Sequence, residues 1–410
     1  MEQDRYDLAV VALHPIQYQA GLWRTIARHP RLRLRVLYLD RVGIDGSIDP
    51  TMKAAMKWNM PLLEGHEYEF LRNLSPFRFT PVVHRLNPGI YGRIRRGGYG
   101  VVILHGYLTL SNWIALLAAR RAGCFVVYRG EGSVRGGDRY DAAALGPLKR
   151  GLSRLFLRYC DAIAYSSQDN RRYQLSRGAR EDRLFSMPCA VDNEERGHMQ
   201  KAAAPSAEFR ARHGLPSDAR LVITVGRFAE HKRMEDCIAA FGEAPLRDRD
   251  DVHLLLVGDG RLRTDLEQQA QNSSASGRIH FLGFLNQQEM VEAVLASDVF
   301  ALASSHGDPS PKALAEALFL ARPIVCSDGV GTCEEAVVDG ENGFVFPTAD
   351  PGALARCIVQ VIADENDRRQ MGERSRSLAR TNDFATGVDS LVRQVDSLHA
   401  ARRRGSGVPS

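Results

Sequence analysis

The chain of 410 residues lacks clustered cysteines, long apolar runs and a strong charge of one sign. Its seven cysteines are scattered and show no CxxC spacing, so we expect reduced core cysteines and neither a metal site nor a redox motif. No apolar run approaches the roughly 18 residues that span a bilayer. The net charge of +5 is too small to indicate nucleic-acid binding.

The first residues, MEQDRYDLAVVAL, are acidic and polar before a short apolar strand. A secretory signal has the reverse order, with cations before a longer apolar segment. We therefore expect a cytoplasmic protein.

One stretch could hold the chain on the inner face of a membrane. Over residues 148–158, basic residues alternate with leucines at helical spacing: Lys149, Arg150, Arg154 and Arg158 among Leu148, Leu152, Leu155, Phe156 and Leu157. This pattern is typical of a basic amphipathic helix on an anionic membrane surface. It is also found in ordinary packed helices with a solvated basic face, so both interpretations stand.

Short β-rich runs alternate with helical stretches in both halves of the chain, which predicts an α/β fold with parallel sheets covered on both faces. A polar, alanine-rich stretch punctuated by proline interrupts the alternation near residue 200. We expect a Rossmann-like domain over 1–200, a linker over 201–218, a second Rossmann-like domain over 219–379, a helix at about 380–400 that completes the first domain, and a disordered basic tail over 401–410. Ligands of such folds bind at the carboxyl ends of the strands.

The stretch 301–323, ALASSHGDPSPKALAEALFLARP, combines a strand, a polar loop and a helix start with two carboxylates. Ser310 is a good N-cap and Pro311 suits the first helical position, so free backbone amides should attract phosphate there. Asp308 lies before this helix and Glu316 inside it. An ion pair between Glu316 and Lys312 is one interpretation. The apolar neighbours of Glu316 favour a second, in which its carboxylate accepts hydrogen bonds from ribose hydroxyls.

Further candidates follow the ends of other predicted strands in the second half. Arg227 and Lys232 come after RLVITVG and could hold a diphosphate, although a basic surface loop would look the same. Gly258 stands in a GDG turn that either approaches a ligand or is plain turn chemistry. The backbone around Phe284 could hold a flat base.

Two candidates follow strand ends in the first half. His105 ends the run VVILH and is either a residue of the site or a structural histidine. Glu131 follows the next strand and could bind acceptor hydroxyls or act as a base, unless it forms a surface pair with Arg129. No GxGxxG motif follows the first strand, which argues against a dinucleotide-dependent oxidoreductase.

In order and spacing, the motifs of the second half resemble the family 4 glycosyltransferases (glycosyl transferases group 1) of the GT-B fold, over roughly residues 220–375. The matching motifs are Val225-Gly-Arg227, Lys232, Gly258-Asp-Gly260, Leu282-Gly-Phe284, Asp308 with Glu316, Pro323 and Asp339-Gly-Glu-Asn-Gly343. The resemblance implies two Rossmann-like, doubly wound domains facing a central cleft, with the acceptor bound by the domain over 1–200 and the nucleotide-sugar donor by the domain over 219–379. It also implies retaining transfer of a sugar, of hexosyl type, from a nucleotide-diphosphate donor, with no tightly bound metal or cofactor.

Carried over by position, the resemblance assigns Arg227 and Lys232 to the diphosphate and Glu316 to the ribose. Asp308 would bind hydroxyls of the donor sugar, and amides around Ser310 and Lys312 would support the distal phosphate. The chain departs from the family at three places. Asp308 replaces the usual Glu, Pro309-Ser-Pro311 replaces a glycine-containing turn, and Arg322 replaces a small residue before proline.

In the first half, the run HPIQY at 14–18 occupies the place of the family's donor-contacting glycine loop. Gly21, expected before a helix, would be the residue of close approach, and His105 would lie near the reacting sugar. Family members with a similar run act mainly on cell-surface or secondary-metabolite glycans. The acceptor would be a glycan, a lipid-linked molecule or a small molecule.

Two other functions fit the same motifs. A GT-B epimerase or hydrolase would act on the nucleotide sugar without an acceptor. A non-catalytic module would bind the nucleotide sugar only, because the shortened Asp308 no longer supports transfer.

Overall fold

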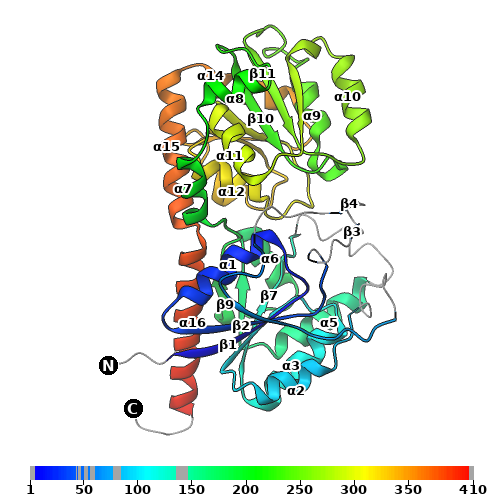
Figure 1. Ribbon diagram of the computed structural model, residues 1–410, viewed down its shortest axis with the longest axis vertical. Helices are drawn as coiled ribbons and strands as arrows, with labels where there is room; N and C mark the ends of the chain where they lie inside the picture. The colour runs from blue at the N-terminus through cyan, green and yellow to red at the C-terminus, as the bar shows by residue number, and fades with distance from the viewer. Residues whose placement is uncertain are drawn as a thin grey trace. The chain divides into compact units, whose positions relative to one another are not determined.

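The computed structural model describes residues 5–42, 44, 48–49, 54–55, 61–76, 85–134 and 146–405 (Figure 1). The chain forms two compact units. Unit 1 comprises Met1–Ser166, Asn170–Pro188 and Phe384–Ser410, and unit 2 comprises Ser167–Asp169 and Cys189–Asp383. The C-terminal segment therefore belongs to the same unit as the first strands.

Unit 1 is built on a seven-stranded sheet in the order β5-β2-β1-β6-β7-β8-β9, with every neighbouring pair parallel. Its strands are β1 Tyr6–Ala12, β2 Leu32–Tyr38, β5 Glu67–Phe70, β6 Val101–His105, β7 Phe125–Arg129, β8 Ala162–Tyr165 and β9 Leu184–Ser186. A separate antiparallel ladder joins β3 Ile48–Asp49 to β4 Ala54–Ala55. The central strands are almost wholly buried, as expected when helices cover both faces of a parallel sheet.

The helices of unit 1 are α1 Gln17–Arg28, α2 Gly89–Arg96, α3 Leu110–Ala122, α5 Gly146–Arg158, α6 Gln168–Ser176, the 3-10 turn η1 Glu181–Arg183, and α16 Phe384–Gly405. Local sequence sets the limits of α3. Thr109 accepts a hydrogen bond from the Asn112 amide at its start, and Gly123 takes a left-handed φ of 75° at its end.

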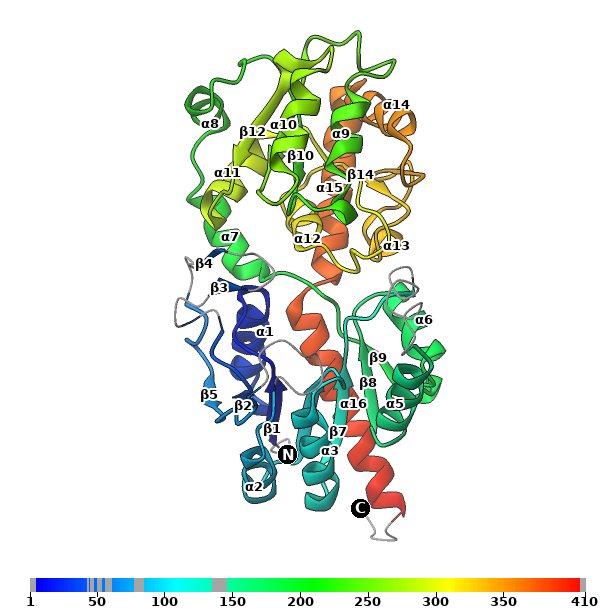
Figure 2. The same cartoon turned by 90° about the vertical axis from the view of Figure 1, so that its right-hand side faces the viewer.

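Helix α16 packs against α1 and β9 (Figure 2). The Asp396 carboxylate accepts hydrogen bonds from the Tyr6 hydroxyl at 2.5 Å and from Arg31 at 2.7 and 2.8 Å, which ties α16 to β1. Residues 401–405 continue this helix, and the rest of the expected tail lies outside the described residues.

Unit 2 holds a six-stranded sheet in the order β12-β11-β10-β13-β14-β15, again with parallel neighbours. Its strands are β10 Arg220–Val225, β11 Val252–Val257, β12 Ile279–Gly283, β13 Val299–Leu302, β14 Ile324–Ser327 and β15 Gly343–Phe346. Counted from β10, the order is the Rossmann order 3-2-1-4-5-6. Strand succession reverses between β10 and β13, the topological switch point of this unit.

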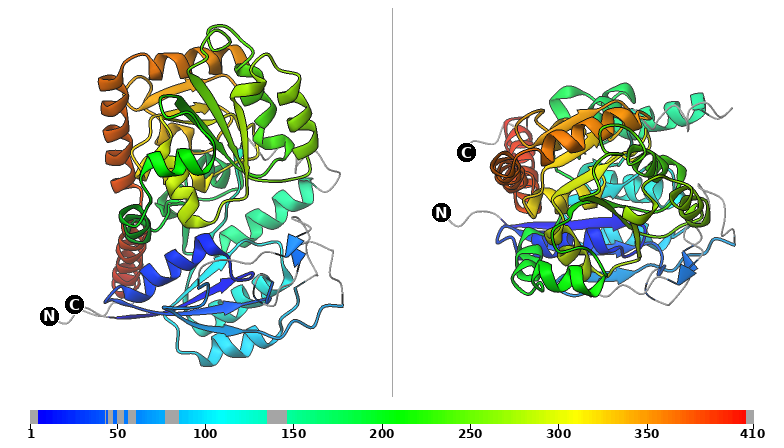
Figure 3. Two further views of the ribbon diagram at one scale, coloured as in Figure 1. Left: turned by 45° about the horizontal axis from the view of Figure 1, so that its top comes forward. Right: turned by 90° about the horizontal axis from the view of Figure 1, so that it is seen from above.

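The helices of unit 2, seen from two further directions in Figure 3, are α7 Asn193–Lys201, α8 Ser206–Arg212, η2 Glu230–Lys232, α9 Met234–Ala240, α10 Arg263–Gln271, η3 Ser276–Arg278, α11 Gln287–Ala296, α12 Lys312–Phe319, α13 Cys333–Ala336, α14 Pro351–Ile362 and α15 Glu365–Thr381. The polar stretch near residue 200 thus forms α7 and α8. It carries structure of its own rather than serving only as a connector.

Side chains of the central strand β10 enter two different cores. Leu221 and Ile223 belong to one buried cluster and Val222 to another, so alternate residues pack on opposite faces of the sheet. The prediction of Rossmann-like, doubly wound units is confirmed.

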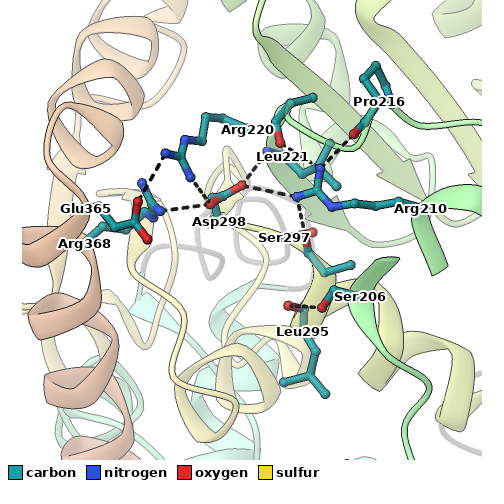
Figure 4. Close-up of polar contacts among 12 residues, drawn as sticks. Ser206, Arg210, Pro216, Arg220, Leu221, Leu295, Ser297, Asp298, Glu365 and Arg368 are labelled. Atoms are coloured by element: carbon teal, nitrogen blue, oxygen red, sulfur yellow. Dashed lines mark hydrogen bonds and ion pairs between the residues drawn. The ribbon is translucent and has the colours of Figure 1, made fainter. Parts of the chain in front are cut away.

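One carboxylate organises the amino-terminal edge of the unit 2 sheet (Figure 4). Asp298, just before β13, accepts a hydrogen bond from the Leu221 amide at 2.8 Å. Its oxygens also lie 3.4 Å from Arg220, 3.7 Å from Arg210 and 3.3 Å from Arg368. The Asp298 side chain is only 13% exposed. A single carboxylate therefore joins β10, α8 and α15 to β13 through ion pairs with three guanidinium groups.

Replacing Asp298 should destabilise unit 2. We expect Asp298→Ala to lower the free energy of unfolding by about 3–5 kcal/mol, because it leaves partly buried arginines without their carboxylate. Urea unfolding combined with hydrogen exchange of the Leu221 amide measures this loss. Asp248→Ala, which removes an exposed partner of Arg247, is the control and should cost less than about 1 kcal/mol. Equal losses in the two variants would contradict this account of Asp298.

Candidate functional site

The residues singled out in the second half of the sequence gather at the carboxyl edge of the unit 2 sheet. Lys232 follows β10, Gly258 follows β11, Phe284 follows β12 and Asp308 follows β13. These strands are parallel neighbours, so their carboxyl ends lie at one edge. Arg227, two residues past β10, is at the same edge with an exposed side chain.

Lys232 and Asp308 are in direct contact across the switch point. The Lys232 Nζ donates a hydrogen bond to the Asp308 Oδ2 at 2.5 Å, and the two side chains are 13% and 9% exposed. The Ser305 amide donates to the His231 carbonyl at 2.8 Å, which also joins the two loops. The pair is neutral as a whole and presents an ammonium and a carboxylate at one point of the edge.

Glu316 lies buried in α12 and forms an ion pair with Arg196 at 2.8 Å. Burial raises the pKa of Glu316, and the positive charges of Arg196 and Lys312 act in the opposite direction. The ammonium of Lys312 donates instead to the Cys189 Sγ, and its Nζ lies 3.5 Å from the Ala190 carbonyl oxygen. The ion-pair partner shown for Glu316 is thus Arg196, a residue that the sequence did not single out.

Arg196 comes from α7, in the stretch that the sequence predicts as a connector. It is 7% exposed, and it also donates to the Gln287 side chain. Asp192 starts this helix by accepting from the Glu195 amide, and that N-cap was the signal available in the sequence. Nothing in the spacing of EERGHM distinguishes a buried arginine from an exposed one, so Arg196 could not be found from the sequence.

The expected start of α12 is wrong by one position. The helix begins at Lys312, Pro311 is the N-cap, and no side chain caps this end. Pro311 has ψ of 119°, which is extended rather than helical, so Ser310 lies before the cap instead of occupying it. The first helical amides belong to Lys312 and Ala313, and the Leu314 amide already donates to the Pro311 carbonyl at 3.2 Å.

Gly258 has a structural reason to be glycine. A Cβ at this position would lie 1.9 Å from the Gly226 carbonyl oxygen, and φ is 138°, a value that side chains rarely allow. Close packing of two loops therefore requires this residue, whatever else it contacts. Phe284 places its ring in solvent with 71% exposed, unlike the buried residues around the sheet.

In unit 1, His105 ends β6 beside Arg129, its register partner at the end of β7. Gln19 of α1 lies 3.5 Å from the His105 Nδ1, and Trp23 meets the His105 ring edge-on at 5.4 Å between centroids. Strand succession reverses here too, between β1 and β6, so His105 and Gln19 flank the switch point of unit 1.

The sequence predicts Gly21 in a loop before a helix, and the structure shows that this position is wrong. Helix α1 begins at Gln17, and Gly21 lies within it, where its carbonyl accepts a hydrogen bond from the Thr25 hydroxyl at 2.9 Å. Gln17, the fourth residue of the run HPIQY, is already the first residue of α1. Its apolar and long side chains favour the helix, and no glycine ends the preceding loop.

His105 is neutral at pH 7. Burial lowers its pKa to about 3, and the charge of Arg129 contributes in the same direction. The Gln19 amide nitrogen is a donor, so the His105 Nδ1 accepts and the ring proton resides on Nε2. Nε2 is buried and has no hydrogen-bond partner within the described residues. The interpretation of a fully satisfied structural histidine does not fit this geometry.

Glu131 lies 3.8 Å from Arg129, which is too far for a good hydrogen bond, and its side chain is 45% exposed. The expected surface pair is therefore loose. Glu131 and His105 share the carboxyl edge of the unit 1 sheet, and their roles toward an acceptor stay predictions.

The described residues contain no group of three or more His, Cys, Asp or Glu side chains suited to a metal ion. Among the helices in the described ranges, none is long and apolar enough to cross a membrane.

Comparison with known proteins gives a family match for the second half of the chain. Residues 205–378 match the family described as glycosyl transferases group 1. The lipopolysaccharide core biosynthesis glycosyltransferase LpsE of Rhizobium meliloti (strain 1021) is 34% identical over 165 residues, 40% of this chain and 46% of LpsE. The chain thus spans about half the length of the curated relatives that it matches first.

Solved structures match over nearly the whole chain. Anabaena HepE, crystallised in complex with UDP, gives a TM-score of 0.72 at 17% identity and covers 96% of this chain and 100% of its own. Sucrose-phosphate synthase from Thermosynechococcus elongatus gives 0.70 at 19% identity and covers 97% and 100%. Residues 205–378 thus resemble the glycosyl transferases group 1 family, and the chain has the GT-B fold of two Rossmann-like units.

Proposed function

We propose that this protein is a retaining glycosyltransferase that moves a hexosyl group from a nucleotide-diphosphate donor to an acceptor hydroxyl. The observation that carries the proposal is the contact between Lys232 and Asp308 at the switch point of unit 2. Ligands of open α/β sheets bind at this point, and the contact offers a cation for phosphate and a carboxylate for hydroxyls side by side.

The buried carboxylate of Glu316 has a matching task. Two vicinal ribose hydroxyls can each donate a hydrogen bond to one carboxylate. Such acceptance requires the ionised form, which burial disfavours and the Arg196 guanidinium favours. Arg196 therefore favours the ionised Glu316 carboxylate that would accept hydrogen bonds from a ribose.

The donor diphosphate would lie between cations and helix amides. Arg227 supplies an exposed planar fork, and Lys232 supplies a point charge. The amides of Lys312 and Ala313 at the start of α12 would support the distal phosphate, in a role expected around Ser310. Asp308 would bind hydroxyls of the sugar, Gly258 would let the loop approach the donor, and the backbone at Phe284 would hold the base.

The transfer step is a substitution at the anomeric carbon. The acceptor oxygen bonds to that carbon on the face from which the diphosphate leaves, the carbon–phosphate-oxygen bond breaks, and the acceptor proton passes to the leaving diphosphate. The protein contributes mainly position and stabilisation of the developing negative charge. His105, Glu131 and the region of Gly21 in unit 1 would contact the reacting sugar and the acceptor.

The relatives suggest which substrates to try first. Anabaena HepE has been crystallised with UDP and with UDP-glucose, so a uridine diphosphate sugar is the first donor to test. LpsE is named for lipopolysaccharide core biosynthesis, and a relative from Streptomyces kanamyceticus, 31% identical over 193 residues, is a 2-deoxystreptamine glucosyltransferase. The proposed acceptor is accordingly a cell-surface glycan, a glycolipid or a secondary metabolite.

Peripheral attachment to an anionic membrane, on its cytoplasmic face, fits helix α5. Leu148, Leu152 and Leu155 are 59%, 36% and 45% exposed, whereas Phe156 and Leu157 are buried in unit 1. The exposed leucines share the helix with Lys149, Arg150, Arg154 and Arg158. An apolar strip among cations suits the boundary between lipid headgroups and acyl chains.

The donor site can be tested by nucleotide binding. UDP at 100 times its dissociation constant should stabilise the protein by roughly 2.7 kcal/mol, seen as a rise in melting temperature. Glu316→Gln should weaken UDP binding about 10- to 100-fold, because a charge-assisted hydrogen bond to the ribose is lost. Calorimetric titration gives the dissociation constants directly.

The matched control is Glu341→Gln, which alters a glutamate of unit 2 paired with Arg374 on the surface. It should leave the dissociation constant for UDP unchanged. If Glu316→Gln binds UDP, GDP, ADP and dTDP as the unaltered protein does, the ribose role is wrong. If none of the four nucleotides binds the unaltered protein, the donor site itself is wrong.

The catalytic assignment depends on Asp308. We expect Asp308→Asn to lower kcat about 100- to 1,000-fold, because a charged contact to the transferring sugar is lost at the transition state. UDP affinity should not fall, because Lys232 loses its carboxylate partner and becomes available to the diphosphate. Asp308→Glu should retain activity. Release of free nucleotide, measured with and without acceptor, is the assay. Unchanged turnover would refute the role, and full release without any acceptor would favour the epimerase or hydrolase alternative.

Membrane attachment predicts co-sedimentation with anionic vesicles. Leu148→Ser together with Leu155→Ser should reduce the bound fraction at least tenfold by removing apolar surface from the interface. Raising salt should also weaken binding, since Arg154 and Arg158 are exposed. Leu117→Ser, which alters an exposed leucine of α3, is the control. Equal binding to neutral and anionic vesicles, or no effect of the double substitution, would count against attachment through α5.

A further inference from the structure

Arg129 is a buried charge of unit 1 with few interactions to compensate it. Its residue is 5% exposed at the end of β7, yet its Nε and Nη1 atoms are buried and have no hydrogen-bond partner within the described ranges. Its ion-pair partner, Glu131, lies 3.8 Å from Nη2. Burying a guanidinium without a close anion costs several kcal/mol, so its retention calls for a partner.

His105 adds a third unused donor on the same face of the sheet. His105 and Arg129 are register partners on parallel neighbours, and side chains at partner positions point to the same face. The electrostatic effect of Arg129 on the His105 ring agrees with this proximity. Because Gln19 donates to Nδ1, the buried Nε2 carries a proton and is a donor.

The ligand must supply acceptors and negative charge. Within the described residues, Arg129 and His105 together offer three donor nitrogen atoms without partners, and neither side chain offers an acceptor there. A neutral hydroxyl could accept one hydrogen bond but would leave the guanidinium charge uncompensated. An oxyanion satisfies both requirements, and a planar guanidinium fits carboxylate and phosphate oxygens especially well.

We propose that the carboxyl edge of the unit 1 sheet binds an oxyanion between Arg129 and His105, next to the unit 1 switch point. The group is a carboxylate or phosphate, either free or carried by a sugar. The binding site does not depend on the proposed function. Its use for an acidic acceptor does rest on that function, and would make the acceptor of this glycosyltransferase an acidic one.

The binding is measured on the full chain without nucleotide. Imidazole resonances of His105, assigned by their loss in His105→Gln, are followed by NMR during titration with inorganic phosphate and with glucuronate at constant ionic strength. Both ligands should shift His105 to saturation. Arg129→Gln should weaken the binding at least tenfold, and Arg129→Lys, which keeps the charge but loses the fork, should weaken it less.

Two controls make the outcome decisive. Arg120→Gln alters an arginine of unit 1 that pairs with Asp161 near the opposite end of β7, and it should bind as the unaltered chain does. Glucose, a neutral sugar, should cause no shift that depends on Arg129.

Saturation by phosphate alone would assign the site to free phosphate or phosphate esters, and saturation by glucuronate alone would assign it to acidic sugars. Lack of saturation with both, or equal binding by Arg129→Gln, would overturn the proposal. An equal response to glucose would show a hydroxyl site instead. Loss of UDP binding in Glu316→Gln would report on the proposed donor site in unit 2. The oxyanion titration reports on unit 1, so each proposal can fail without the other.

Discussion

Parallel pairing of β10 with β13 is the constraint on which the proposed donor site depends. The two strands are adjacent in the sheet but far apart in the sequence, and both end at the same edge. Lys232 and Asp308 can meet only because of that topology. Unit 1 repeats the arrangement with different residues, since Gln19 follows β1 and His105 ends β6. Each unit thus brings polar side chains together where strand succession reverses, as expected for open α/β sheets.

Buried charge separates the structural residues from the candidate functional ones. Asp298 is compensated by arginines and a backbone amide, so it serves the fold. Glu316 has one cation, Arg196, and burial still raises its pKa, so its carboxylate retains capacity for further donors. Arg129 has the least compensation of these groups. The buried charge with the most partners, Asp298, thus serves the fold. The buried charges with fewer partners, Glu316 and Arg129, lie at the candidate sites.

The fold and half of the site follow from local sequence patterns. Alternating strand and helix signals predict parallel sheets, and the loops after each strand predict Arg227, Lys232 and Asp308 at one edge. The start of α12 at Lys312 and the place of Gly21 inside α1 were missed, because single residues at helix ends are fixed by packing as well as by capping preference. Contacts between distant segments have no local signature. For that reason the partner of Glu316 became visible only in the structure.

The Lys232–Asp308 contact also sets an electrostatic condition on donor binding. A neutral pair attracts a diphosphate less than a free ammonium does, so the full attraction of Lys232 is available only when Asp308 has another partner. Sugar hydroxyls are donors and can replace the ammonium at Asp308. A nucleotide diphosphate without a sugar lacks those donors. In the proposed donor site, binding of the sugar and binding of the diphosphate are therefore coupled through one ion pair.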